Sequence, residues 1–357
     1  MKALVAYPPN RGSVVLEERP IPSPGPGQAL LSVVRVGIDG TDMEIGEGVY
    51  GAPPEGERGL IIGHEALARV EEVGGGVTNV KAGDLVVPTV RRPCPENCIN
   101  CRSGEMDRCR TGYYREHGIH MLHGFAAEKG LTDAKYLVKA PEGELDDAIV
   151  MAEPLSVVEN AVDEVFRVQR RMRWEPKNAL VVGVGAIGLL TTMVLRLRGL
   201  EVIAMATGDK DNPKAQAVQR VGGRYISTRE VPISQLDERF DIIIEATGAA
   251  GPAVSALQRL DRNGAMCLLG IYREQAICEE MGKVLSNMVL QEQMLFGSVS
   301  AKKEHFEQGI EDMRRMEEEW PGALPSLITQ RVRMEEFQKA LAPPHDNIKT
   351  VIEIGGR

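Results

Sequence analysis

The chain of 357 residues is long enough for two domains of ordinary size. Hydrophobic residues make up 43% and charged residues 26%, which is typical of a folded protein with a buried core. The formal net charge of −9 argues against proteins that bind nucleic acid or anionic membranes through a basic surface. The N-terminus lacks a signal-peptide pattern and no stretch is apolar enough to span a membrane, so we expect a cytoplasmic protein.

The first 150 residues or so contain short β-rich runs separated by turns. These runs cover residues 3–7, 28–38, 61–74 and 84–90. Segments rich in Pro and Gly, such as PSPGPGQ and GAPPEGERG, separate them. This pattern predicts a compact, mostly β domain with irregular loops.

The pattern changes at about Glu153, where residues 153–172 have the apolar spacing of a helix. Predicted strands then cover residues 178–185, 201–207, 224–227, 240–247 and 264–271, with helices at 186–199, 212–222 and 252–260. Strands alternating with helices predict βαβ units and a doubly wound parallel sheet, which makes the chain an α/β protein. The C-terminal segment offers a helix and a strand that rejoin the first domain. We therefore expect domains at 1–160 with 301–357, and at 161–300.

The second domain contains a dinucleotide fingerprint. The motif GVGAIG follows a predicted strand and precedes a predicted helix, and this context is typical of a dinucleotide-binding site. They permit a tight turn, close approach of the backbone to a pyrophosphate, and close packing of helix against strand. The helix N-terminus then offers free N–H groups to phosphate oxygens. The predicted cofactor residues are Gly183, Gly185, Ala186, Ile187, Gly188, Thr207 and Lys210.

The end of the second strand bears on the choice of dinucleotide. NAD enzymes usually end this strand with an acid that binds the ribose diol. Here the strand ends at Thr207, Asp209 comes late, and Lys210 follows it. NADP is therefore favoured over NAD, with use of both left open. No arginine lies at this point of the sequence to hold a 2′-phosphate.

Four cysteines lie within sixteen residues, with spacings typical of a loop that wraps a metal ion. They are Cys94, Cys98, Cys101 and Cys109. Thiolates in this number match a structural zinc site, and the spacings match neither common ferredoxin pattern. Full coordination by four thiolates leaves no position for substrate, so we expect a structural zinc here.

Three further segments complete a pattern: GIDGTD at 37–42, GHE at 63–65 and EPL at 153–155. In this order, around the cysteine loop and ahead of the fingerprint, they resemble the zinc-dependent medium-chain dehydrogenases/reductases. PTVRRPC, EPLSVVENA and FGSVSAKKEHFEQG resemble the archaeal-type glucose dehydrogenases within that superfamily. The resemblance covers essentially the whole chain. It implies a GroES-like catalytic domain, a Rossmann domain and an active site between them.

The resemblance also implies site residues. The catalytic zinc would be held by Asp39 and His64, with Glu65 and Glu153 acting directly or through water. Thr41 would relay the hydroxyl proton, and Asp42 would orient His64 through its other ring nitrogen. Zinc would polarise the substrate hydroxyl, and hydride would pass to the nicotinamide. The implied reaction oxidises an aldose, with the C1 hydroxyl of D-glucose giving gluconolactone as the leading expectation.

The chain departs from the family pattern at two places. Most of the superfamily has Cys where this chain has Asp39, so we expect a retained catalytic zinc that binds more weakly than the zinc of the cysteine loop. The opposite hypothesis is that Asp39 marks a site without metal. Ser300 stands where related sugar dehydrogenases have Asn, and Gln291 where His is common. Thr89 is either a contact for a sugar hydroxyl or a solvated turn residue.

Several alternatives remain open at this stage. One is a sorbitol-like polyol dehydrogenase or a threonine-type dehydrogenase with a similar zinc site. Another is a zinc-free quinone or enoyl reductase, although those relatives generally lack GHE and the cysteine loop. A non-enzymatic zinc ribbon that binds nucleic acid is disfavoured by the acidic charge. We expect a homodimer or homotetramer in which edge strands within GAMCLLGI and MVLQEQMLFGSVS pair between subunits.

Overall fold

The structure is a computed structural model that describes residues 1–143, 148–273 and 281–355. It divides into two compact units. Unit 1 comprises Met1–Ser156, Ala301–Arg314 and Leu324–Arg357, and unit 2 comprises Val157–Ser300 and Arg315–Ala323. We expected the last of these segments in the first domain. It lies instead with unit 2, where Pro321 O accepts a hydrogen bond of 2.5 Å from Arg220 Nη2.

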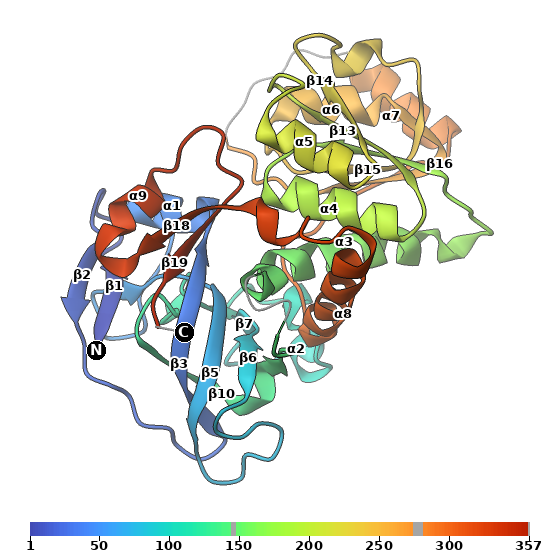
Figure 1. Cartoon of the computed structure of the whole chain (residues 1–357). Helices are drawn as coiled ribbons and strands as arrows, with labels where there is room; N and C mark the ends of the chain where they lie inside the picture. The colour runs from blue at the N-terminus through green and yellow to red at the C-terminus, as the bar shows by residue number, and fades with distance from the viewer. Residues whose placement is uncertain (144–147, 274–280, 356–357) are drawn as a thin grey trace. The chain divides into compact units, whose positions relative to one another are not determined.

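Unit 1 is built mainly from strands in three sheets, drawn in blue, cyan and red in Figure 1. The small sheets have the orders β2-β1-β4 and β7-β8-β9, and the large sheet has the order β11-β6-β5-β3-β19-β18 with β10 also on β3. The bounds are β1 (Lys2–Ala6), β2 (Val15–Glu18), β3 (Gln28–Ile38), β4 (Leu60–Ile61), β5 (Glu65–Val73), β6 (Leu85–Pro88), β7 (Arg91–Arg92), β8 (Arg115–His117), β9 (Met121–Leu122), β10 (Lys129–Asp133), β11 (Leu137–Lys139), β18 (Ile328–Arg333) and β19 (Lys349–Glu353).

Strand β3 organises this unit because three strands share it. Along one edge it pairs with β5, and along the other its first part pairs with β10 and its last part with β19. The register sets Gly37 opposite Glu65 and Ile38 opposite Thr350. The C-terminal strand therefore does rejoin the first domain, and β18 pairs parallel to it. This register brings the end of β3 and the first residues of β5 and β19 to one place.

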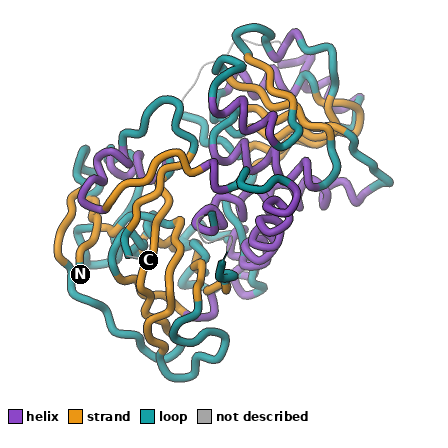
Figure 2. The backbone as a smooth tube through the Cα atoms, viewed as in Figure 1, coloured by secondary structure: helices purple, strands orange, loops and turns teal. Residues whose placement is uncertain are grey.

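Short helices connect the strands of unit 1, namely α1 (Gly40–Gly46), α2 (Ile99–Arg102) and α9 (Phe337–Leu341). Two longer helices cross the division between units, α3 (Ala152–Val168) and α8 (Lys303–Glu319). Figure 2 shows the contrast between the strand-rich first unit and the second unit, where helices flank the sheet.

Unit 2 is a doubly wound parallel sheet with the order β14-β13-β12-β15-β16-β17, as the alternating pattern predicted. The bounds are β12 (Asn178–Val182), β13 (Glu201–Ala206), β14 (Arg224–Ser227), β15 (Phe240–Glu245), β16 (Leu260–Leu268), β17 (Met294–Gly297), α4 (Ala186–Leu197), α5 (Pro213–Arg220), α6 (Ala250–Leu257) and α7 (Met281–Leu290). Successive residues of a strand face opposite sides of the sheet. Leu180 and Val182 accordingly share a buried cluster with Leu257 of α6, while Val181 faces α4.

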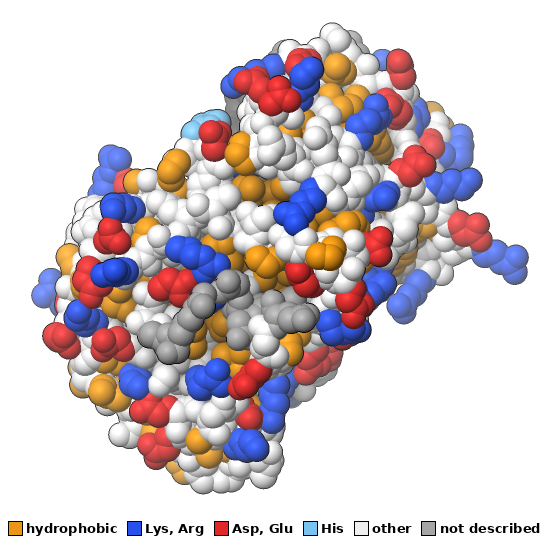
Figure 3. All heavy atoms as spheres, viewed as in Figure 1, with side chains coloured by type: hydrophobic (Ala, Val, Ile, Leu, Met, Phe, Trp, Pro, Cys, Tyr) orange, Lys and Arg blue, Asp and Glu red, His pale blue; other side chains and the backbone are white. Residues whose placement is uncertain are grey.

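Both units have a charged surface. Basic and acidic side chains are interspersed on the face drawn in Figure 3. Within the residues that the structure describes, no helix is both long and apolar enough to cross a membrane. The apolar residues are instead buried in the cores of the two units, where aliphatic side chains predominate over the few aromatic ones.

Candidate active site

Asp39 follows β3 and caps helix α1. Its carboxylate accepts hydrogen bonds from the backbone N–H groups of Thr41 at 2.8 Å and Asp42 at 3.2 Å. The Thr41 hydroxyl donates to Asp39 Oδ2 at 3.1 Å, and Asp42 Oδ2 accepts from the backbone N–H of Asp39 at 3.2 Å. This reciprocal arrangement is a capping box. The local sequence DGTD therefore fixes Asp39 before any ligand is considered.

His64 lies immediately before β5, beside the same cap. Its Nε2 atom is 3.7 Å from Asp39 Oδ2, and its Nδ1 atom is 4.0 Å from Asp42 Oδ2. The second distance is too long for a hydrogen bond. The predicted bond from Asp42 to the ring is therefore not made in this structure. Asp42 instead accepts from the backbone N–H of Gly63 at 3.0 Å, which positions the residue just before His64.

Two buried glutamates and a lysine complete the cluster. Glu65 opens β5 and forms an ion pair with Lys349 at the start of β19. Both side chains are almost fully buried. Glu153, in the first turn of α3, is buried as well and acts electrostatically on His64. Sequence reasoning missed Lys349, although a lysine directly before the β-branched run Thr350–Ile352 is a signal that could have been noticed.

The pKa values of the cluster reflect burial and an excess of carboxyl groups over cationic groups. Burial raises the pKa of Glu153 to about 8 and that of Asp42 to about 7. Burial disfavours the charged form of His64, but the carboxylates of Asp39 and Glu153 outweigh it and raise the pKa of the ring to about 9. For Asp39, burial is likewise outweighed by the charges of His64 and Lys349, so its pKa falls. Two cationic groups face four carboxyl groups.

This donor set fits a divalent metal ion. One ligand atom each from Asp39, His64 and Glu65 lies within 4.8 Å of the others. His64 Nδ1 is buried without a hydrogen-bond partner, and the ring shares the site with carboxylates that its own charge does not neutralise. Carboxylate oxygen and imidazole nitrogen are both ordinary zinc ligands. A divalent ion would supply the positive charge that the protein side chains lack.

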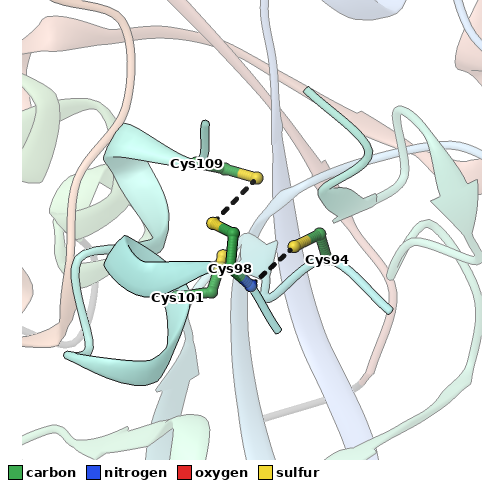
Figure 4. Close-up of side chains that lie close together, drawn as sticks. All are labelled: Cys94, Cys98, Cys101 and Cys109. Carbon is green, nitrogen blue, oxygen red and sulfur yellow. Dashed lines mark hydrogen bonds between the residues drawn. The ribbon is translucent and has the colours of Figure 1, made fainter. Parts of the chain in front are cut away.

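The cysteine loop forms a second candidate metal site, shown in Figure 4. The four sulfur atoms lie within 4.8 Å of one another, and Cys98 Sγ is 4.0 Å from Cys109 Sγ. A tetrahedral zinc with bonds of about 2.3 Å places its sulfurs about 3.8 Å apart, close to this arrangement. Backbone N–H groups lower the pKa of the Cys98 thiol to about 6, which favours the thiolate that binds metal. All four predicted ligands are thus brought together.

The dinucleotide fingerprint has the expected backbone geometry. Gly183 has a φ of 99°, and Gly185 caps the twelve-residue helix α4 without a side-chain hydrogen bond. A Cβ atom on Gly188 would lie 1.9 Å from Gly183 O, so only glycine permits this contact. A Cβ on Gly185 would meet nothing within 4 Å. Ala186 and Ile187 lie in the first turn of α4, whose N–H groups have no acceptor within the helix.

The structure adds an arginine near the end of β13. Arg229 follows β14, and its Nη1 atom is 3.7 Å from Asp209 Oδ1. Both side chains are largely exposed, as is Lys210. The sequence beside Thr207 offers no arginine, but parallel pairing of β13 with β14 brings one from twenty positions beyond Asp209 to the same edge of the sheet.

Five residues were predicted to contact substrate: Thr41 and Glu153, which lie in the cluster described above, and Thr89, Ser300 and Gln291, which lie in different surroundings. Thr89 is buried, and its hydroxyl oxygen accepts from Arg92 at 3.1 Å, so the reading as a solvated turn is wrong. Ser300 follows the carboxyl end of β17, where its carbonyl accepts from Asn160 Nδ2. Gln291 instead precedes β17 and its carbonyl accepts from the backbone N–H of Asn263. Ligands of such sheets bind at the carboxyl ends of strands, so the prediction for Gln291 requires correction.

Comparison with known proteins agrees with this geometry. A family model described as the C-terminus of glucose dehydrogenase matches residues 146–354, more than half of the chain. A model for the alcohol dehydrogenase GroES-like domain matches residues 25–142. The chain belongs to the glucose dehydrogenase family. It is thereby a member of the zinc-dependent medium-chain dehydrogenases/reductases, with the GroES-like and Rossmann folds expected of that superfamily.

Named members of the family align along the full length. Glucose 1-dehydrogenase 1 of Caldivirga maquilingensis is 46% identical over 355 residues, 99% of each chain. Glucose 1-dehydrogenase of Thermoproteus tenax has the same identity and coverage. Among solved structures, the glucose dehydrogenase of Haloferax mediterranei in complex with NADP, zinc and gluconolactone has a TM-score of 0.92 at 32% identity, with all of both chains covered.

The glycine contact gives a first prediction. Replacing Gly188 with Ala forces a Cβ against the Gly183 carbonyl, and such overpacking typically costs about 1–3 kcal/mol. We expect a lower melting temperature and loss of NADPH binding, followed by the fluorescence of the bound nicotinamide. Gly251→Ala in α6 is the control, because its Cβ would meet nothing within 4 Å. Unchanged NADPH binding in Gly188→Ala would contradict the role of this contact.

The cysteine loop gives a second prediction. Cys98→Ser should remove one zinc per chain and lower the melting temperature, because a structural zinc contributes directly to folding. The zinc content of the purified protein, measured by elemental mass spectrometry, checks this. Ser103→Ala, in the same loop, removes only a hydroxyl that donates to Ile99 O and should keep the zinc. Equal zinc content in Cys98→Ser and the wild type would rule out the four-cysteine site.

Proposed function

We propose that the protein is a zinc-dependent glucose 1-dehydrogenase that oxidises the C1 hydroxyl of D-glucose to gluconolactone and reduces NADP. The observation that carries the proposal is the buried cluster of Asp39, His64 and Glu65 in a chain that aligns end to end with glucose dehydrogenases. The sugar is supported by those relatives. Within this chain, Ser300 replaces the amide that related sugar dehydrogenases carry, so the choice among aldoses is the part to test first.

The residues of unit 1 divide the work at the reacting hydroxyl. Asp39 and His64 would hold the zinc, and Glu65 lies close enough to be a third ligand. Glu153, which acts electrostatically on His64, would take part directly or through water. Zinc bound there would polarise the sugar hydroxyl and lower its pKa. Thr41 donates a hydrogen bond to Asp39, so its oxygen can accept a hydrogen bond from the sugar hydroxyl. As a relay it would take up the proton that the sugar loses and release its own proton toward solvent. The ion pair with Lys349 neutralises Glu65 and offsets the free-energy cost of burying its charge.

Unit 2 would bind and orient the dinucleotide. The pyrophosphate would lie over Gly185, against the N–H groups of the first turn of α4. Thr207, at the end of β13, would face the adenosine ribose. With no acid at the tip of that strand, a 2′-phosphate meets less repulsion, and Arg229 and Lys210 are available to attract it. This arrangement supports NADP over NAD.

Arg229→Ala tests the cofactor assignment. Hydrogen bonds to charged groups are worth about 1.5–3 kcal/mol, so we expect KM for NADP to rise about ten- to a hundredfold while KM for NAD changes little. The exposed pair with Asp209 contributes little stability, so folding should be unaffected. Arg224→Ala is the control, since Arg224 begins β14, the strand that Arg229 follows, but pairs with Glu238. Equal changes for both dinucleotides would contradict the assignment.

The edge of the unit 2 sheet supports a homo-oligomer. Within the described residues, β17 pairs only with β16 and leaves its other edge open. Exposed apolar side chains gather on β17 and α7 and just beyond β17: Leu285, Val289, Leu290, Leu295 and Val299. An open edge beside exposed apolar residues is a surface for pairing. A second copy paired at β17 would make a dimer, and a tetramer would need a further contact.

The oligomer is tested by light scattering after gel filtration. We expect the wild type to be a dimer or tetramer and a Val289→Glu, Leu290→Glu double variant to give a smaller species. A wild-type monomer would overturn the proposal. Four thiolates gathered at a metal site are typical of a reducing compartment, which supports the cytoplasmic location expected from the sequence.

A substrate panel tests the proposed reaction. Initial rates of NADP and NAD reduction are measured with glucose, galactose, xylose, sorbitol and threonine, before and after treatment with EDTA. We expect activity on glucose, loss of that activity with EDTA and recovery with zinc. Activity on sorbitol or threonine alone would replace the aldose by a secondary alcohol as substrate. Activity on glucose that EDTA leaves unchanged would overturn the metal site.

A further inference from the structure

Unit 1 contains a cavity whose lining includes none of the proposed zinc ligands. Its volume is about 620 Å³, and it lies between the N-terminal strands, the loop before β4 and strand β10. Its charged lining residues are Arg19, Arg92, Arg115, Lys129, Glu57 and Asp133. Neither the reaction proposed above nor the dinucleotide site uses any of them.

Two arginines in this lining face one another across a pair of strands. Arg92 of β7 and Arg115 of β8 are direct partners in the antiparallel register. Like charges directly opposite each other destabilise such a pair. Arg92 is 3% exposed, so solvent screens its charge poorly. Pairing β7 with β8 therefore costs free energy unless an anion offsets the charges of the two arginines.

Arg92 is bonded to neutral oxygens in this structure. Its Nη1 atom donates to Thr89 O, Thr89 Oγ1 and Arg91 O, and its Nη2 atom donates to Thr132 Oγ1 at 2.7 Å. Arg115 Nε is buried and has no hydrogen-bond partner. In the described part of the chain, neither guanidinium forms an ion pair with a carboxylate. Asp133 attracts Arg92 through space without contacting it as an ion pair.

The other charges of the lining are already matched by partners. Arg19 pairs with Glu17, and Lys129 pairs with Glu71. Glu57 is occupied by His123, whose Nε2 is 3.0 Å from its carboxylate. Within the described residues, the lining charges that remain without an ion pair are the two cations Arg92 and Arg115 and the one carboxylate of Asp133, which leaves a positive excess. A guanidinium presents a planar set of donors that fits the oxygens of phosphate.

We propose that this cavity binds the phosphate group of a small soluble molecule, held by Arg92 and Arg115. The cavity has room for more than the phosphate itself, so the natural ligand would be a phosphorylated metabolite. Lys129 and His123 lie at the lining to contact the rest of such a ligand. The site is separate from the dinucleotide fingerprint, which lies in unit 2.

The test titrates inorganic phosphate into the zinc-loaded protein by calorimetry at constant ionic strength, with NADP at saturation to fill the dinucleotide site. We expect one saturable phosphate site per chain and a rise in melting temperature on binding. Arg115→Gln should weaken phosphate binding at least about tenfold, since it removes a charged donor. Arg11→Gln should bind as the wild type does, because Arg11 is exposed, pairs with Glu47 and lies outside the cavity.

A second readout separates an anion site from a structural role. In phosphate-free buffer, Arg115→Gln should melt at the same temperature as the wild type or higher, because it removes the like-charge pair. A lower melting temperature there would assign Arg115 to structure and overturn the proposal. Absence of saturable binding to the wild type, or equal weakening by Arg115→Gln and Arg11→Gln, would also overturn it. Tighter binding of citrate than of phosphate would replace the phosphate by a polycarboxylate and contradict the stated ligand.

Discussion

The buried charge at the shared end of β3, β5 and β19 is the constraint on which the proposed chemistry depends. The register of these strands brings Asp39, His64, Glu65 and Lys349 together, and α3 adds Glu153. Burying charge in a protein interior is costly unless it is paired. Burial raises the pKa values of Glu153 and Asp42, and the neighbouring carboxylates add to the effect, because Lys349 and the ring of His64 are only two cations among four carboxyl groups. A site with this imbalance is prepared for a divalent cation.

Unit 2 is prepared for an anion rather than a cation. Gly188 lets α4 begin close against Gly183, and this leaves the N–H groups of its first turn free at the carboxyl end of β12. Anions are stabilised there by the backbone rather than by a basic side chain. A protein with net charge −9 can therefore bind a polyanionic dinucleotide. Unit 1 thus offers carboxylates to a cation, and unit 2 offers backbone N–H donors to phosphates.

Local patterns predicted most of this fold, and long-range pairing accounts for what they missed. The alternation of strands and helices after Glu153 identified the parallel sheet, and short motifs identified the fingerprint and the four cysteines. The capping box of Asp39 was recognised only in the structure. Lys349 and Arg229 were not found, because each reaches its place only through pairing with a distant strand. Gln291 was predicted because related proteins often have His at that position of the family pattern. It lies before β17, so a position in the pattern does not tell at which end of the sheet a residue lies.

The zinc content of the purified chain tests the central claim most directly. The wild type should hold two zinc ions per chain, one in the cysteine loop and one at the cluster of Asp39 and His64. The second ion should be removed first by EDTA, since carboxylate binds zinc less tightly than thiolate does. His64→Ala should hold a single zinc while keeping the fold and the loop zinc. A wild-type protein with one zinc per chain, unchanged in His64→Ala, would contradict the account.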